Sequence, residues 1–557
     1  MKKIIAASIG NCVHVAGIMN FLSLAEKEGY ETEFCGAAIS IDELICAVKA
    51  EKPDYVGVSY RLTPEPLEKI LDELKSKIAA ENIKGIKWLF AGTEPTAEVA
   101  KKSGIFSHIF NGTEDPDEVI GFLKGITFAK SDDYPQDLVS RIKSKYPYPI
   151  LRHHIGLPSL EETIEAIKKV ADAKVLDVIS IAPDQNAQEH FFEQDKMDHR
   201  LDGAGGVPLR SKEDFKALYE ASRRGNYPLL RCYSGTKDLI PFAEMLNETI
   251  KNAWCAVPLY WYSVLDKRGP RPVEEAIREN QQVMKWHGQR SIPVEVNESH
   301  HWSLRDAHDT IGVVTAYLAA YNAKKMGVKD YVAQYMFNVP PSISPAMDIA
   351  KMLAKIELIE SLEDESFNVY RQARAGIASF PADLAQAKGQ LASSAYLAMA
   401  IKPHIYHVVG YCEAHHAATA DDVIESCKIV RGVIRNVMLG ASDITKDPII
   451  QERKNELIAE ARVTLEAIKS LSPNVKDPLS DPSTLAKAVE IGILDAPHLR
   501  GNPAAKGQLV TQMINGALYA YDPVEKRVLT EKERIDRILS KIDTTTNICD
   551  FNHELVV

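Results

Sequence analysis

Polar side chains stand at the ends of short apolar runs throughout residues 149–440. Each run has the length of a strand, and each ends in residue types that enzymes use to bind and transform small molecules. Among them are guanidinium groups, which can bind a carboxylate in a bidentate pair, together with carboxylates and imidazoles. The runs end in Arg152-His153-His154, Asp184-Gln185-Asn186, Arg231-Cys232-Tyr233, Tyr260-Trp261-Tyr262, Asn297-Glu298, Arg371-Gln372 and Tyr411-Cys412-Glu413.

Eight of these apolar runs occur in about 290 residues, and a helical stretch follows each one, which is the count of a closed parallel barrel. We therefore predict a (β/α)8 TIM barrel over residues 149–440. Because the carboxyl ends of barrel strands gather at one mouth, the polar residues that end the runs are expected there. The runs begin near Ile150, Val175, Leu229, Ala253, Ile292, Tyr331, Val369 and Tyr406.

A shorter α/β block precedes the barrel. Residues 1–126 hold five βα repeats, which predicts a doubly wound, flavodoxin-like parallel sheet whose ligand binds beyond the carboxyl ends of the strands. The polar, proline-punctuated residues 127–148 are interpreted as a linker, and residues 441–557 as a C-terminal extension. The strands of the first block are expected at Ile4–Ile9, Glu31–Cys35, Tyr55–Ser59, Lys87–Ala91 and His108–Phe110.

The composition is that of a globular enzyme. Its 557 residues are 45% apolar and 26% charged, and they are too many for one hydrophobic core. The net charge of −11 argues against a nucleic-acid binder, because such affinity depends on Lys and Arg neutralising phosphates. No apolar run is long enough to span a membrane, the N-terminus lacks a signal-peptide cleavage site, and the eight scattered cysteines indicate reduced thiols. We therefore expect a cytoplasmic protein with no nucleic-acid or membrane partner.

Histidines and cysteines at the expected mouth raise the question of a metal or a nucleophile. Glu298, His300 and His301 are close in sequence, but neighbours on an extended stretch point to opposite faces, so hydrogen bonding to a ligand is favoured over zinc. The cysteines that end or begin barrel strands lack a recognisable base and are interpreted as buried small side chains. They are Cys232, Cys255 and Cys412.

The loop after the first strand carries a family resemblance. It reads Asn11-Cys12-Val13-His14-Val15-Ala16-Gly17 and resembles the D-x-H-x-x-G loop of cobalamin-binding domains. The resemblance continues in Ser59-Tyr60-Arg61-Leu62-Thr63-Pro64, in Ala91-Gly92 and in Phe110-Asn111-Gly112-Thr113. It implies that His14 binds the cobalt of a cobalamin from below. It also implies that the cofactor is lined by Gly17, Ser59, Thr63, Gly92 and Gly112.

Two positions depart from the pattern of that family. Cys12 replaces the usual Asp and cannot offer His14 a carboxylate partner, so the tuning of the cobalt ligand differs. Arg61 replaces the Leu of an S-x-L segment and brings a bulky cation into a slot that is normally apolar.

The barrel resembles the large subunit of glutamate mutase (methylaspartate mutase), and the first block then corresponds to that enzyme's small cobalamin-binding subunit. The resemblance implies an adenosylcobalamin cofactor, with Glu413 holding the adenosyl ribose and with Arg152 and Arg231 binding a substrate carboxylate. These three residues form the implied catalytic set. The resemblance rests on Pro228-Leu229-Leu230-Arg231 with Gly235-Thr236 and Asp238, on Gly376 with Phe380 to Ala387, on Glu413-Ala414 and on Leu494-Asp495-Ala496-Pro497.

Departures from the mutase family bear on the substrate. Residues 202–206 stand where a third carboxylate-binding arginine is expected, and residues 254–258 lack the Glu that meets the substrate's amino group. Losing such charged partners weakens binding, so the substrate is predicted to be a small carboxylate other than glutamate. Aromatic residues near the fourth strand suggest a larger or less polar molecule. The further substrate-binding residues expected are Tyr260, Tyr262, Asn297, Glu298 and Arg371.

Together these features predict a homodimeric adenosylcobalamin-dependent radical isomerase, a carbon-skeleton mutase. Because the first strand begins near residue 3, no helical cap is expected ahead of the corrinoid domain, and the barrel is expected to shield the cofactor's upper face. Two alternatives stay open. The segment from Ser59 to Pro64 also resembles methionine synthase, which would indicate a corrinoid-dependent methyltransferase. A degenerate barrel would indicate a non-catalytic cobalamin sensor or carrier.

Overall fold

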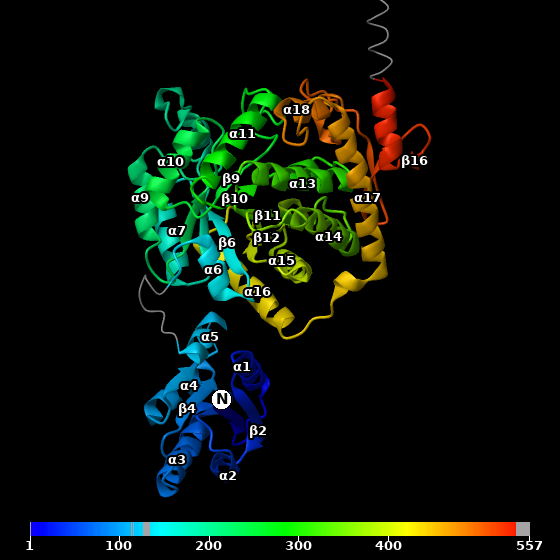
Figure 1. Ribbon diagram of the computed structural model, residues 1–557. Helices are drawn as coiled ribbons and strands as arrows, with labels where there is room; N and C mark the ends of the chain where they lie inside the picture. Colours follow the sequence, from blue (N-terminus) through cyan, green and yellow to red (C-terminus); the bar gives the residue numbers. More distant parts are fainter. Residues whose placement is uncertain (1, 113, 115, 126–133, 542–557) are drawn as a thin grey trace, which may run out of the picture. The chain divides into compact units, whose positions relative to one another are not determined.

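The computed structural model describes residues 2–112, 114, 116–125 and 134–541, and the chain folds into two compact units, Met1–Asp133 and Tyr134–Val557 (Figure 1). Of the segment expected to be a linker, residues 127–133 lie outside the described residues. Its remainder belongs to the second unit and contains helix α6 (Leu138–Lys145). Residues 542–557 of the expected extension also lie outside the described part of the chain.

The first unit is a parallel sheet of five strands in the order β2-β1-β3-β4-β5. Helices α1 and α5 contact each other, and α2, α3 and α4 form a second contacting group, which is the layering of a doubly wound fold. The predicted flavodoxin-like architecture is confirmed. The elements are β1 (Lys3–Ile9), α1 (Ala16–Lys27), β2 (Glu31–Ile39), α2 (Ile41–Glu51), β3 (Tyr55–Tyr60), α3 (Pro64–Ala80), β4 (Lys87–Gly92), α4 (Glu94–Ser103), β5 (His108–Phe110) and α5 (Pro116–Lys124).

The central strand shows why this sheet forms. Strand β1 is apolar along nearly its whole length and is buried on both faces, as expected for a strand between helical layers. Helix α2 begins at a capping box, in which the Ser40 hydroxyl accepts from the backbone N–H of Glu43 and the Glu43 carboxylate accepts from the N–H of Ser40. The apolar pattern of β1 and the capping box of α2 therefore determine where these elements begin and end, and so where the loops between them lie.

The second unit is a barrel of eight parallel strands in the order β8-β7-β6-β13-β12-β11-β10-β9. Its two end strands are bridged by backbone bonds from Ala253 N to Leu230 O (2.9 Å) and from Ser234 N to Ala256 O (3.2 Å), which nearly close the barrel and confirm the prediction. The strands are β6 (Ile150–Ile155), β7 (Val178–Ile181), β8 (Leu229–Cys232), β9 (Cys255–Val257), β10 (Val294–Val296), β11 (Asp330–Phe337), β12 (Asn368–Ala375) and β13 (Ile405–His407).

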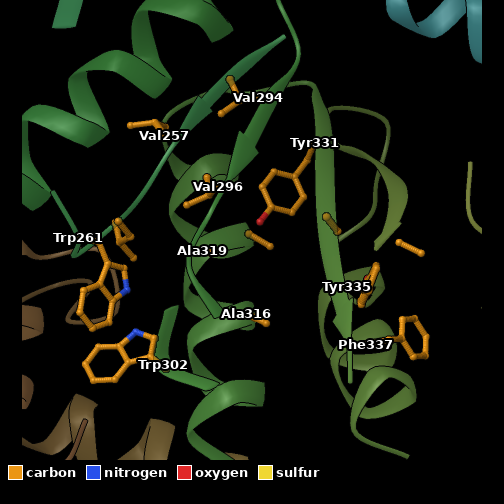
Figure 2. Packing of buried hydrophobic residues seen from close by; sticks show 14 of the residues in the cluster. Val257, Trp261, Val294, Val296, Trp302, Ala316, Ala319, Tyr331, Tyr335 and Phe337 are labelled. Atoms are coloured by element: carbon orange, nitrogen blue, oxygen red, sulfur yellow. The ribbon is translucent and has the colours of Figure 1, made fainter. Parts of the chain in front are cut away.

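Helices surround these strands (Figure 1). Figure 2 shows part of the buried cluster, which includes Tyr331, Tyr335 and Phe337 of β11 and the small side chains Ala316 and Ala319. The helices of the barrel are α7 (Leu160–Asp172), α8 (Gln185–His190), α9 (Lys212–Ala221), α10 (Leu239–Ile250), α11 (Val273–Gly288), α12 (Ser299–Ser303), α13 (Asp309–Lys325), α14 (Pro345–Glu360), α15 (Leu384–Ala398) and α16 (Ala420–Met438).

The C-terminal extension packs on the barrel. Helix α13 is buried along almost its entire length, because α14 and α17 (Pro448–Ser470) cover the side that a surface helix exposes. The carboxylate of Asp309 binds Lys351 (3.2 Å), Arg453 (3.5 Å) and the backbone N–H of Leu518, which ties the extension to α13 and α14. The extension also contains α18 (Pro482–Glu490) and an antiparallel sheet of β14 (Thr511–Ile514), β15 (Ala517–Asp522) and β16 (Arg527–Val528).

Within the described part of the chain, no helix is long and apolar enough to cross a membrane.

Candidate functional sites in the two units

The loops after β1 and β3 lie at the point where the strand order of the first unit reverses, which is where doubly wound sheets bind ligands. Contacts of the buried Cys12 join these two loops. Its carbonyl accepts from the Ser8 hydroxyl (2.6 Å), and its sulfur accepts from the backbone N–H of Arg61 (3.4 Å). The residue that replaces the expected Asp therefore braces the loop, while the Arg61 side chain is exposed.

His14 presents its imidazole at this crevice. The side chain is exposed, and its Nδ1 lies 3.7 Å from the sulfur of Cys12. Its Nε2 contacts no partner among the residues that the structure describes. Because Nδ1 lies at the loop and Nε2 has no partner among the described residues, Nε2 is the nitrogen that could bind a metal ion.

Four other cofactor residues expected from the sequence lie at the ends of strands β3, β4 and β5 or just after them. Gly92 cannot carry a side chain, because a Cβ there would lie 2.3 Å from the Thr96 hydroxyl and 2.8 Å from a backbone carbonyl. Gly112 has a φ of +87° and sits against the carbonyl of Gly92. Ser59 is buried at the end of β3, and Thr63 is exposed before α3.

The chemistry of this donor set fits a cobalamin. An open imidazole suits the cobalt, and glycines and hydroxyls suit a narrow slot for a polar nucleotide tail. Gly17 is exposed on the first turn of α1, where a Cβ would meet no atom within 4 Å, so the structure gives no close-packing reason for a glycine there. Thr113, part of the fifth-strand motif, lies outside the described residues.

In the barrel, four interior residues from alternate strands, which we call the lower layer, form a hydrogen-bonded ring that Ser180 of β7 closes. Arg152 Nε donates to Gln372 Oε1 (2.7 Å), and Gln372 Nε2 donates to Glu295 Oε1 (2.9 Å). Glu295 Oε2 accepts from Arg231 (3.2 Å). Both arginines also bind the Ser180 hydroxyl, at 2.8 and 3.3 Å, which completes the ring.

The structure thus brings together the two arginines expected to bind substrate. Both guanidinium groups, however, already make hydrogen bonds to other residues of the lower layer and to Ser180. Arg152 and Arg231 are 2% and 0% exposed, so the lower layer is closed to solvent. Burial and the nearby Arg231 lower the pKa of Arg152 to about 9, an effect that Glu295 opposes. The acid that neutralises this pair is therefore Glu295, which the sequence analysis did not single out.

Two residues further along the same four strands, a second set of polar side chains follows, which we call the upper layer: His154, Tyr233, Asn297 and Arg374. The Tyr233 hydroxyl bonds the ring of His154 (3.0 Å), and the rings of His154 and His407 lie 4.7 Å apart. Burial and the nearby arginines hold the pKa values of both histidines well below their usual range, so both are neutral at pH 7. The amide oxygen of Asn297 has no partner among the described residues.

Arg374 is the functional candidate that sequence reasoning missed. It pairs in register with His407 and is partly exposed, and the one side-chain hydrogen bond that it makes within the described residues runs from Nε to the carbonyl of Ala375 (3.2 Å). Across residues 2–112, 114, 116–125 and 134–541, no carboxylate lies within ion-pair distance of it. Burial lowers its pKa, whereas Tyr233 and Glu413 oppose this effect.

Glu413 lies on the turn that follows β13 and is exposed. Partial desolvation raises its pKa, and the guanidinium of Arg374 opposes that shift. The expected ribose-binding carboxylate and the missed arginine therefore interact across the carboxyl end of the barrel.

Arg371 is placed differently from the sequence expectation. It lies halfway along β12 and pairs with Glu360, the last residue of α14, through Nε to Oε1 (2.5 Å) and Nη2 to Oε2 (2.8 Å). Barrel helices run antiparallel to the strands, so the end of α14 marks the amino end of the barrel. Arg371 therefore braces the end opposite the mouth, because the strand continues past Gln372 to Ala375.

The remaining expected residues gather around β9 and β10, largely buried. Glu298 accepts from the backbone N–H groups of Leu259 (2.7 Å) and Tyr260 (3.1 Å) and from the indole of Trp302 (2.7 Å). Burial raises the pKa of Glu298 to about 7. The Tyr260 hydroxyl is buried without a partner in the described residues, and Tyr262 adopts a φ of +61°, a strained conformation for a bulky side chain.

Comparison with known proteins identifies the first unit. Residues 2–120 match the family model described as B12 binding domain, so the chain carries a cobalamin-binding domain. No curated protein matches the chain.

Among solved structures, a cobalamin-binding protein from Desulfitobacterium hafniense is 21% identical over 22% of this chain and 56% of its own length, with a TM-score of 0.19. The cobalamin-dependent S-adenosylmethionine radical enzyme OxsB is 11% identical over 83% of this chain and 56% of its own, with a TM-score of 0.22. The BexX/CysO complex from Amycolatopsis orientalis is 10% identical over 53% and 93%, with a TM-score of 0.27. The chain thus spans little more than half the length of the first two.

Proposed function

We propose that this protein is an adenosylcobalamin-dependent isomerase whose barrel binds a small carboxylate. The observation that carries the proposal is the upper layer of the barrel. A cobalamin-binding domain shares the chain with a barrel whose upper layer holds Arg374, which has no carboxylate within ion-pair distance among the described residues, and the amide oxygen of Asn297, which has no hydrogen-bond partner among them. Leaving a partly buried guanidinium unpaired is costly, and a bound carboxylate removes that cost.

In this proposal the first unit holds the corrinoid. His14 would bind the cobalt, Ser59, Thr63, Gly92 and Gly112 would line the slot for the nucleotide tail, and Glu413 would accept hydrogen bonds from the hydroxyls of the adenosyl ribose. Bound adenosylcobalamin supplies an adenosyl radical by homolysis of its cobalt–carbon bond.

The barrel residues then bind, orient and shield. Arg374 holds the substrate carboxylate in a bidentate pair and so fixes which carbon is presented. The neutral ring of His154 and the hydroxyl of Tyr233 bond a second polar group of the substrate without competing for the carboxylate. The buried aromatic residues around β9 exclude water, which protects radical intermediates from side reactions.

Isotope transfer tests the isomerase assignment. We expect deuterium from adenosylcobalamin labelled at the 5′ carbon to appear in one or more members of a panel of small carboxylic acids incubated with the purified protein. Methyl transfer from methylcobalamin, with no deuterium transfer, would identify a methyltransferase instead. Binding of both cofactors with neither reaction would identify a carrier.

Spectroscopy tests the cobalt ligand separately. In the Co(II) form, we expect nitrogen hyperfine splitting that changes when the protein is labelled with 15N-histidine, and we expect His14→Ala to abolish it. A spectrum that shows only the cofactor's own benzimidazole nitrogen would refute the role of His14.

A further inference from the structure

We propose that Cys412, His416 and Asp422 form a site for a divalent transition-metal ion on the turn after β13, a site additional to the cobalamin. One ligand atom from each residue, a thiol sulfur, a ring nitrogen and a carboxylate oxygen, lies within 4.8 Å of the other two. This set of soft and borderline donors suits Zn²⁺ or Co²⁺ rather than Mg²⁺ or Ca²⁺, which prefer oxygen. The site goes beyond the proposed isomerase and does not depend on it.

Local backbone structure brings the three donors together. The backbone N–H of His416 donates to the carbonyl of Cys412 (2.9 Å), a single turn that places residues four apart on the same side. Asp422 lies in the first turn of α16, which begins just after this loop. The cluster therefore joins the end of β13 to the start of α16.

The atoms that would not bind the metal already have partners, as in assembled metal sites. The Nδ1 of His416 lies 2.9 Å from the Nδ1 of His415, which leaves Nε2 facing Asp422 Oδ2 at 3.2 Å. The other oxygen of Asp422 accepts from the Tyr411 hydroxyl (2.8 Å). These contacts fix the orientation of both the imidazole and the carboxylate.

A capping role explains only part of this arrangement. Asp422 forms a capping box with Thr419, whose N–H and hydroxyl donate to Oδ2 at 3.0 and 2.6 Å. Capping accounts for the carboxylate but not for the paired histidines or for a thiol beside it.

The cluster is graded from buried to exposed, since Cys412 is buried, Asp422 is partly exposed and His416 is exposed. A metal can therefore enter from the His416 side and keep a water as its fourth ligand. Glu413 lies on the same turn, between two of the ligands, so the metal would hold in place the loop that carries it.

Cobalt(II) titration of the cobalamin-free, reduced full-length protein tests the site. We expect one equivalent of Co²⁺ to bind with a near-ultraviolet thiolate-to-cobalt absorption and tetrahedral visible bands, and we expect Zn²⁺ to bleach both. Cys412→Ser should abolish the thiolate band. His416→Ala, at an exposed position, should weaken binding at least tenfold.

Cys427→Ser is the matched control, because Cys427 is a buried cysteine of α16 outside the cluster. It should leave the titration unchanged. Absence of stoichiometric binding, absence of the thiolate band, or equal affinity in His416→Ala would each overturn the proposal. None of these readouts involves cobalamin, so they remain valid even if the isomerase assignment fails.

Discussion

Replacing Arg374 with Gln removes a cation that has no carboxylate within ion-pair distance in the described part of the chain, although Glu413 interacts with it at longer range. Because no ion pair is broken, we expect the free energy of unfolding to change by less than about 1 kcal/mol, or to rise. Binding of a carboxylate should suffer instead. Hydrogen bonds to charged groups contribute about 1.5–3 kcal/mol, so affinity should fall roughly ten- to hundredfold.

Arg371→Gln is the matched control from the same strand. Its guanidinium makes two bonds to Glu360 and one to the carbonyl of Ile401 (2.7 Å). Both ion-pair partners are about a quarter exposed, so solvent screens part of their attraction, and we expect a loss of stability of about 1–2 kcal/mol. Carboxylate affinity should be unchanged, because this residue lies at the opposite end of the barrel.

The assay has two independent readouts. Calorimetric titration with a panel of small carboxylates selects the tightest-binding acid, which is then titrated into both variants. Urea denaturation gives their stabilities. The reasoning is refuted if Arg374→Gln binds that acid as tightly as the parent protein, or if folded Arg371→Gln loses the affinity.

Three further outcomes are expected. Glu295→Gln leaves Arg152 and Arg231 without their acid and should lower the free energy of unfolding by about 3–5 kcal/mol. Urea denaturation measures this change. An unchanged midpoint would contradict the role of Glu295 in neutralising the two arginines. Burial lowers the pKa values of His153 and His308 to about 4, so between pH 6.5 and 4 these histidines are protonated in the unfolded chain but neutral in the folded chain. The free energy of unfolding should therefore fall as the pH falls across that window. Denaturation at pH 7.5 and at pH 5.0 checks this. Glutamate should be a poor substrate, and rapid formation of 3-methylaspartate would show otherwise.

Strand and helix periodicity was sufficient to predict both folds. The eight barrel strands begin within three residues of the expected positions, because apolar runs of strand length alternate with helical stretches whose ends carry caps. The motif residues of the first unit, apart from Gly17 in α1, lie at strand ends or in the loops that follow them, because a doubly wound sheet places every βα loop at the same edge.

The charge partners could not be predicted, because they depend on register. Only Asn297 and Glu298, at the end of the strand, were considered as candidates from the sequence. Glu295 lies earlier in that strand, yet it faces the interior and neutralises Arg231. Arg374 was missed because β12 was ended at Gln372, three residues early. Extending the period-two alternation from Gln372 would have placed Arg374 on the same interior face.

The arginines of the two layers differ in whether they already have hydrogen-bonded partners. Arg152 is bonded to Gln372, and Arg231 to Glu295, which also accepts from Gln372. A carboxylate that reached these arginines would have to displace an existing hydrogen bond and would gain little binding energy. Arg374, one layer nearer the mouth, gains a new pair outright. If the proposed function holds, a substrate with one carboxylate would receive the full stabilisation, whereas the second carboxylate of a dicarboxylate would meet arginines that are already neutralised. This difference, rather than the number of arginines in the sequence, is the physical reason for expecting discrimination against glutamate.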